Sequence, residues 1–447
     1  MRRVAVVGSG IAGLSVAWRL ADEAQVTLFE AGPYFGGHTH TVDLTLPARD
    51  GTGDVTHGVD TGFLVFNERT YPRLIALFAE LGIATTATEM SFSVQARATG
   101  LEWSGSDLNS VFAQRRNLLR PRFLGMLAEV LRFNRVATRI AERGDDDNDD
   151  DNDDAQMQQS IGDFLDAQRF SPLFRDGYFL PMIGSIWSCP TEQMLRFPVA
   201  TMIRFCHNHG LLQVANRPRW FTVVGGARRY VEKMLPRIAD ARLNTPVRSV
   251  RRLPPGQGSA GVMVRTDTGS ERFDELVLAC HSDQSLALLD DATPAERTLL
   301  GVIRYHRNRA VLHTDTRQLP QQRRAWAAWN YERAAELPRE QAAVCLHYLI
   351  DRLQPLPFRE PVIVSLNPVR EIAADRVHGE FDYAHPVFDA AAIAAQQGLP
   401  ALQGQAHTWF CGAWTRYGFH EDGLMSGLAV VDGLRERWAA AEQGAAA

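Results

Sequence analysis

Lysine is almost absent from this chain of 447 residues, since Lys233 is the one lysine among 47 basic residues. Cysteine is scarce and widely spaced, without a Cys-x-x-Cys pair, at Cys189, Cys206, Cys280, Cys345 and Cys411. This spacing favours neither a disulfide framework nor a zinc site. No apolar run reaches the ~18 residues that a membrane-spanning helix needs. We therefore expect a soluble, cytoplasmic protein without a metal centre.

The negative charge of the chain is concentrated in one short segment. Residues 145–154 read DDDNDDDNDD, and removing these eight aspartates changes the formal net charge from −5 to +3. Such a run repels itself, which predicts a disordered acidic loop. It lacks the glycine and the terminal glutamate of an EF-hand loop, so we do not expect calcium binding.

The N-terminus carries a dinucleotide-binding pattern. An apolar strand over 4–7 runs into Gly8, Gly10 and Gly13, and a helix is predicted to begin at Ile11 and Ala12. Gly8 permits the tight turn, Gly10 lets the backbone approach a pyrophosphate, and Gly13 allows close helix packing. The free N–H groups of the helix N-terminus favour the phosphates.

Two features after this turn indicate which dinucleotide binds. Glu30 ends a second strand, about 20 positions beyond the motif, where a carboxylate would hold ribose hydroxyls. Gly36 and Gly37 then bring a second stretch of backbone to the same ligand, which NAD-dependent dehydrogenases rarely need. The whole segment resembles the FAD fingerprint of the FAD-dependent amine oxidase and phytoene desaturase superfamily. His38 departs from it, because those enzymes usually carry arginine there, although an imidazole can still donate a hydrogen bond.

The resemblance returns near the C-terminus. A strand ending at Gly412, a loop, and a helix opening at Asp422 and Gly423 resemble the C-terminal flavin segment of these enzymes. The resemblance implies that this helix N-terminus faces the flavin N1 and C2 carbonyl and stabilises the reduced ring. The usual glutamate is replaced by Ala413.

The resemblance also implies the domain organisation. We expect an α/β fold with a discontinuous Rossmann-type FAD-binding domain and an inserted α+β substrate domain. The FAD-binding domain would comprise 1–65, 220–282 and 405–438, and the substrate domain 66–219 and 283–404. Backbone near Val247 would contact the adenine. We expect non-covalent FAD, because Cys411 fits a buried small side chain and His38 a pyrophosphate donor better than covalent attachment sites.

The scarcity of lysine bears on the reaction. Amine oxidases of this superfamily place a lysine beside the flavin N5, and Lys233 lies in the wrong segment for that role. A closer resemblance is to bacterial FAD/NAD-binding oxidoreductases associated with cyclopropane fatty acid synthases, which implies lipid acyl-chain chemistry. Its motifs are Gly37–Val42, Val59–Phe63, Glu89–Ser93, Arg115–Leu119, Asn208–Leu212 and Ala325–Tyr331.

Aromatic residues outside the Rossmann segments are compatible with an acyl-chain tunnel, although ordinary core packing explains many of them. They are Phe92, Trp187, Trp220, Trp326, Trp329, Tyr331, Trp414, Tyr417 and Phe419. His420 or Glu421, beside the flavin loop, is the predicted catalytic base, and His313 and His281 are weaker candidates.

The segment 115–143 combines apolar residues at near-helical spacing with eight arginines. Such a segment either packs its apolar face into the core or lies on an anionic membrane surface. Our hypothesis is hydride transfer to flavin N5 from an apolar substrate, with a fatty acyl chain as the leading candidate, by desaturation or isomerisation. The alternatives are an amine oxidase and a non-catalytic, flavin-bearing partner of a lipid-modifying enzyme. No nucleic acid is expected.

Overall fold

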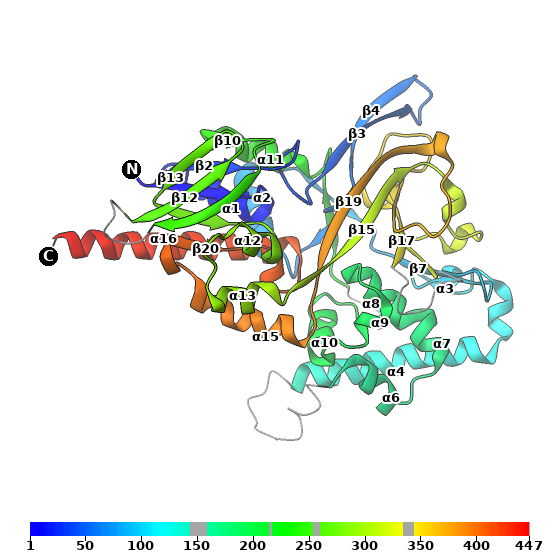
Figure 1. The fold of residues 1–447 in the computed structure, drawn as a ribbon. Helices are drawn as coiled ribbons and strands as arrows, with labels where there is room; N and C mark the ends of the chain where they lie inside the picture. Colours follow the sequence, from blue (N-terminus) through cyan, green and yellow to red (C-terminus); the bar gives the residue numbers. More distant parts are fainter. Residues whose placement is uncertain (144–158, 214–216, 254–259, 334–343, 447) are drawn as a thin grey trace.

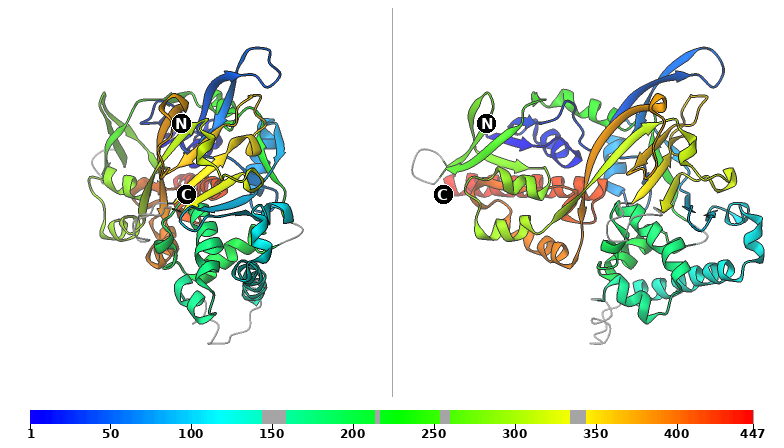
Figure 2. Two further views of the ribbon diagram at one scale, coloured as in Figure 1. Left: turned by 90° about the vertical axis from the view of Figure 1, so that its right-hand side faces the viewer. Right: turned by 45° about the vertical axis from the view of Figure 1, so that its right-hand side comes forward.

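The computed structural model describes residues 1–143, 159–213, 217–253, 260–333 and 344–446. The fold is built around two large β-sheets (Figures 1 and 2). The first, the nucleotide sheet, has five parallel strands. In spatial order these are β10 (Asp240–Arg242), β2 (Gln25–Phe29), β1 (Arg3–Val7), β14 (Glu275–Leu278) and β20 (Thr408–Phe410).

Both faces of the nucleotide sheet are covered, which explains why its strands are apolar throughout. Helices α1 (Ile11–Leu20) and α16 (His420–Ala446) share a hydrophobic cluster with Val4 and Val6 of β1. Ala5 and Val7 pack on the other side, against a three-stranded antiparallel sheet and the helices after it. These are β11 (Val247–Leu253), β12 (Gly261–Thr266), β13 (Gly269–Phe273), α12 (Ser282–Leu288), α13 (Pro294–Gly301) and α15 (Ala390–Gly398).

Glycine permits the close packing of α1. A Cβ at Gly13 would lie 1.9 Å from the carbonyl oxygen of Gly8, and a Cβ at Gly427 of α16 would lie 2.5 Å from that of Ala12. The same Cβ at Gly13 would lie 3.1 Å from the side chain of Ala279, which follows β14, in keeping with the close helix packing expected there.

The second sheet has seven strands and is antiparallel, except that β7 and β16 are parallel. Its spatial order is β19 (Val377–Val387), β15 (Arg304–His313), β18 (Ile363–Leu366), β17 (Cys345–Leu349), β16 (Trp329–Arg333), β7 (Phe92–Ala96) and β8 (Leu101–Ser104). A helical layer lies below this sheet in Figure 1 and shares its hydrophobic core. It contains α4 (Pro121–Arg143), α6 (Ile161–Ala167), α7 (Pro172–Phe174), α8 (Leu180–Trp187), α9 (Thr191–Met194) and α10 (Val199–Asn208).

Smaller elements join the two halves. The hairpin β3 (Thr41–Pro47) and β4 (Asp54–Asp60) projects at the top of Figure 1. A small sheet is formed by β5 (Phe66–Asn67), β9 (Trp220–Val223) and β6 (Thr85–Thr88). The remaining α-helices of the described chain are α2 (Pro72–Leu81), α3 (Leu108–Val111), α11 (Arg228–Met234) and α14 (Ile350–Leu353).

The expected fold class is confirmed, and the structure adds detail to the predicted segments. Helices α2, α13 and α15 lie in segments predicted for the substrate domain but pack in the clusters of the nucleotide sheet. We therefore place them with the nucleotide half, and the predicted division into domains stays a prediction. The acidic segment 145–154 lies outside the described residues.

The basic segment 115–143 is not one helix. A 3-10 helix, η1 (Arg115–Leu119), precedes α4, which begins at Pro121. Proline fits the first turn of a helix but cannot continue one, because it lacks an N–H group. Among the described helices, none has both the length and the apolar character needed to cross a bilayer.

Candidate active site

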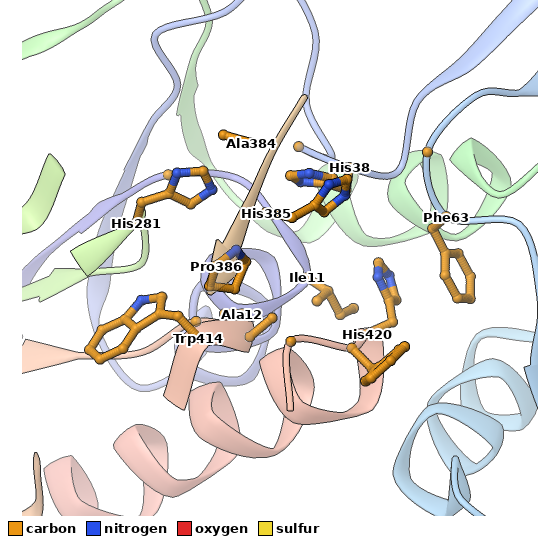
Figure 3. Close-up of a pocket in the computed structure, with 18 of the residues that line it drawn as sticks. Ile11, Ala12, His38, Phe63, His281, Ala384, His385, Pro386, Trp414 and His420 are labelled. Carbon is orange, nitrogen blue, oxygen red and sulfur yellow. The ribbon is translucent and has the colours of Figure 1, made fainter. Parts of the chain in front are cut away.

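A cavity of about 710 Å³ lies between the nucleotide sheet and the seven-stranded sheet. Figure 3 shows its wall, with α1 and the α16 N-terminus on one side and β19 residues opposite. Most of the residues predicted to bind the cofactor line it. They are Gly8, Gly10, Ile11, Ala12, Glu30, Gly36, Gly37, His38, Val247 and Gly412.

The two glycine turns meet at one end of this cavity. Gly8 has φ +101°, and a Cβ there would lie 2.9 Å from the carbonyl oxygen of Ala279. A Cβ at Gly37, with φ +58°, would lie 3.1 Å from the Cα of Gly10. At Gly10 itself a Cβ would meet no protein atom within 4 Å, so its missing side chain leaves room on the cavity side.

Polar groups at this end suit a dinucleotide. Glu30 accepts hydrogen bonds from the Ser9 amide at 3.0 Å and the Gly32 amide at 2.8 Å, which hold its carboxylate at the end of β2. Gly10 is the N-cap of helix α1 and offers no side-chain cap, so the first N–H groups of the helix are available to an anion.

His38 provides the clearest fit to a missing ligand. The residue is partly buried, and its Nε2 atom is buried without a hydrogen-bond partner in the described structure. Burial and the neighbouring His281 lower the pKa of His38 to about 4. Because an unpaired buried polar atom is costly, this nitrogen fits a group that a bound pyrophosphate would supply. Together with the open space at Gly10 and the free α1 N-terminus, the site fits FAD.

Two further histidines lie beside His38. The ring centroid of His385 lies 5.3 Å away and that of His281 6.4 Å away, and both residues line the cavity. Burial lowers the pKa of His281 to about 4 and that of His385 to about 3, the latter helped by His38. His385 comes from β19, and its Nδ1 accepts a hydrogen bond from the side-chain amide of Asn308 at 2.9 Å. The position of His385 in the cavity wall was not predicted, because the sequence around residue 385 contains no recognisable motif.

His420 lies in the cavity wall, as expected of a candidate base. Its ring stacks on Phe63 with a centroid distance of 3.9 Å, and its Nε2 lies 2.9 Å from the Tyr230 hydroxyl. Burial and His38 lower the pKa of His420 to about 3. The ring is therefore neutral at pH 7 and is a weak proton acceptor.

Glu421 does not line the cavity, and its hydrogen bonds favour a structural role over the base role, which stays a prediction. Its two carboxylate oxygens accept hydrogen bonds from the amides of Arg73 at 2.8 Å and Leu74 at 2.9 Å. These are free N–H groups of the first turn of α2, so Glu421 joins α16 to the start of α2. We assign it a structural role.

Three predicted cofactor residues lie just behind the wall. Asp422 accepts a hydrogen bond from the Phe419 amide at 2.9 Å, which orders the loop before α16, and burial raises its pKa to about 6. A Cβ at Gly423 would lie 2.9 Å from Ile11, so this glycine allows α16 to approach α1. Gly13 likewise permits close packing, in its case of α1 on the backbone of Gly8. These residues position the wall and do not touch the cavity.

The remaining sequence candidates separate into two groups. Trp187, Trp220, Trp329, Trp414, Tyr417 and Phe419 line the cavity, whereas Trp326 and Tyr331 do not. His313 is buried against Ser365 in the seven-stranded sheet, at 2.6 Å, and does not line the cavity. Cys411 is fully buried in the core beside α16, where burial raises the pKa of its thiol. Lys233 is exposed on α11, outside the cavity.

Comparison with known proteins agrees with this geometry. Residues 11–312 match the family described as flavin containing amine oxidoreductase. A curated carotenoid phi-ring synthase from Streptomyces griseus is 30% identical over 293 residues, which cover 62% of this chain and 52% of that protein. The chain therefore matches about half the length of this relative.

Solved structures share the fold over nearly the whole chain. A CLA-producing fatty acid isomerase from P. acnes has a TM-score of 0.65 at 13% identity, covering 96% of this chain and 98% of its own. A putative protoporphyrinogen oxidase from Exiguobacterium sp. 255-15 has a TM-score of 0.64 at 14% identity, covering 98% and 99%. A putrescine oxidase bound to putrescine has a TM-score of 0.65 at 15% identity, covering 97% and 99%. The chain belongs to the flavin-containing amine oxidoreductase family and is an FAD-dependent oxidoreductase.

Proposed function

We propose that this enzyme oxidises or isomerises an apolar substrate, with a fatty acyl chain as the leading candidate. The single observation that carries the proposal is the apolar and aromatic wall of the cavity beyond the nucleotide end. Trp187, Phe205 and Phe419 form one aromatic group there, with the rings of Phe205 and Phe419 stacked at 4.9 Å. Such a wall binds hydrocarbon through burial of apolar surface.

The polar groups of the wall support the same substrate class. When bound, the flavin supplies a hydride acceptor at N5. The described residues lining this part of the cavity include no lysine and no aspartate. The histidines are held neutral by burial, so a cationic amine would find no carboxylate partner beside it.

The low histidine pKa values favour isomerisation over desaturation. Desaturation removes a hydride from one carbon and a proton from its neighbour, and the proton needs a base. Moving a double bond by removing an allylic hydride and returning it to the far end of the allylic cation needs neither a base nor an external acceptor. With a pKa of about 3, His420 is better suited to positioning the chain than to accepting that proton. The names of two similar proteins, a carotenoid ring synthase and a fatty acid isomerase, support an apolar substrate.

The test is an anaerobic titration of the FAD-loaded enzyme with unsaturated fatty acids, saturated fatty acids and primary amines, followed by the flavin spectrum and product analysis. We expect an isomerised fatty acid without net bleaching of the flavin, or bleaching with a desaturated product. Bleaching by amines, with neither result from any acyl substrate, would refute the proposal and establish an amine oxidase.

A further inference from the structure

A second cavity of about 120 Å³ adjoins the first one. The two share the wall residues Met90, Ile186, His209, Leu211, Trp220 and Trp329. The second cavity continues between apolar side chains such as Phe92, Trp103 and Met182. Two of its lining residues, Gly105 and Arg217, are exposed, which favours an opening beside them.

The two cavities reach the surface at different places. Ala31, Gln284 and Ala287 are the exposed lining residues at the end where Glu30 lies, which suits entry of the nucleotide. Gly105 follows β8 of the seven-stranded sheet, and Arg217 precedes β9 of the small sheet. An apolar substrate therefore has an entrance of its own, separate from the cofactor.

A strongly apolar surface begins at Leu108, close in sequence to Gly105 at this entrance. Eight large hydrophobic side chains are strongly exposed in the described part of the chain, and five lie between 108 and 131. These are Leu108 (77% exposed), Leu118 (49%), Leu119 (88%), Leu124 (42%) and Leu131 (54%). They lie on α3, η1 and one side of α4, and α4 runs along the outer edge of the molecule in Figures 1 and 2.

The same surface is strongly basic. Its exposed arginines are Arg115, Arg116, Arg120, Arg122, Arg135 and Arg139. Between 108 and 141 the sequence has one acidic residue, Glu129, and its carboxylate is bound to the amide and hydroxyl of Ser171. Within the described structure, Arg122 and Arg135 make no ion pair, so their charges are available to a partner. We call the exposed residues of 108–139 the basic leucine face.

Charge decides which partner fits this face. A second copy of the chain would bring another basic face against it, and like charges would oppose that contact. An anionic bilayer offers phosphate groups to the arginines and hydrocarbon to the leucines, at the depth where an amphipathic helix binds. A core role alone does not explain α4, because Leu124 and Leu131 point away from the buried Phe123 and Phe133.

We propose that the basic leucine face binds anionic lipid bilayers and that the second cavity receives the apolar substrate directly from the bilayer. The second half of this inference rests on the proposed function, whereas the first half does not.

The first test is co-sedimentation of the FAD-loaded enzyme with phosphatidylglycerol vesicles and with phosphatidylcholine vesicles. We expect binding to the anionic vesicles that weakens as salt increases. Arg122→Gln combined with Arg135→Gln should weaken binding about 25-fold, since each charge near the surface contributes about a factor of five. Arg251→Gln with Arg265→Gln, on the three-stranded sheet of the nucleotide half, is the matched control and should bind normally.

Leucine variants separate lipid binding from a protein interface. Leu118→Ser with Leu119→Ser should reduce vesicle binding at least tenfold. The control, Val224→Ser with Val369→Ser, changes exposed side chains outside this face and should leave vesicle binding unchanged. Absence of binding to anionic vesicles, or equal binding by all four variants, overturns the proposal. A concentration-dependent dimer that the Leu118 and Leu119 changes abolish also overturns it, in favour of a protein partner.

A second measurement keeps the two proposals apart. The rate of acyl turnover is compared for substrate in vesicles and for substrate in neutral detergent micelles. The arginine variant should be slowed with vesicles and unchanged with micelles. If no acyl substrate reacts in either form while vesicle binding persists, the proposed function fails and membrane binding stands. If the arginine variant is slowed equally with vesicles and with micelles, the proposal that substrate is delivered from the bilayer is overturned.

Discussion

At the scale of single residues, the glycines of the first turn have different tasks. Gly10 has open space on its side-chain side, whereas Gly13 touches the backbone of Gly8. Gly10→Val should therefore leave the fold intact but fill the place of the pyrophosphate, giving colourless protein whose unfolding midpoint matches that of the flavin-free wild type. Gly13→Ala should lower that midpoint, because α1 has to move.

The control for both changes is Gly125→Ala in α4, where a Cβ meets nothing within 4 Å. It should keep the flavin and stabilise the protein by up to about 1 kcal/mol, since alanine favours helix. Thermal unfolding measures the stability of each variant, and the ratio of flavin to protein absorbance measures its flavin content. Yellow protein with full flavin content in the Gly10→Val variant would contradict the assignment of the pyrophosphate site.

His420 gives a prediction about pH. Burial and His38 lower the pKa of its folded form from 6.5 to about 3, so the unfolded chain binds its proton first as the pH falls. The stability that this residue contributes is present above pH 6.5 and is lost progressively below it. Between pH 6.5 and 4 the loss is about 3 kcal/mol for this one group.

His420→Gln keeps a hydrogen-bonding group but removes the titration. Urea unfolding of the holoenzyme at pH 7, 5.5 and 4.5 should show a smaller loss of stability in the variant than in the wild type. His38, His281 and His385 have lowered pKa values too, so part of the slope remains. Parallel curves for the two proteins would show that His420 is not held neutral by the fold.

At the scale of secondary-structure elements, Glu421 links two helices. Glu421→Gln removes one of two acceptors for the free amides of α2 and should destabilise the protein by about 1 kcal/mol, in the range of a lost N-cap. The rate of acyl turnover should stay within about twofold. A loss of turnover of a hundredfold or more with an unchanged unfolding midpoint would restore Glu421 as the base.

Local elements could be predicted from the sequence, and long-range pairings could not. The turn from β1 into α1 is encoded within ten residues, and Glu30 ends the next strand, so their geometry follows from adjacent signals. The parallel pairing of Phe92 on β7 with Trp329 on β16 has no such signal, because the two strands are far apart in the chain. The approach of His385 to His38 depends on that same distant assembly.

At the scale of the whole molecule, the two halves meet at the cavity, and residues of both line it. The residues predicted to bind the nucleotide lie close together in the sequence, because the glycine turns that would contact it are short segments. The residues of the apolar wall do not form a sequence motif. The wall that Met90, Leu211 and Trp329 share between the two cavities comes from three distant segments, which only the complete fold brings together.

The shared wall gives a test of the path between the cavities. Leu211→Trp adds a large side chain where the two meet, so it should obstruct the passage without touching the nucleotide end. Flavin content should stay normal and a small chemical reductant should still bleach the flavin. Turnover of long acyl chains should fall at least tenfold, mainly through a higher KM. Leu119→Trp, on the surface, is the matched control in detergent micelles and should leave turnover unchanged. Unchanged turnover of long chains by Leu211→Trp would show that the substrate reaches the flavin by another route.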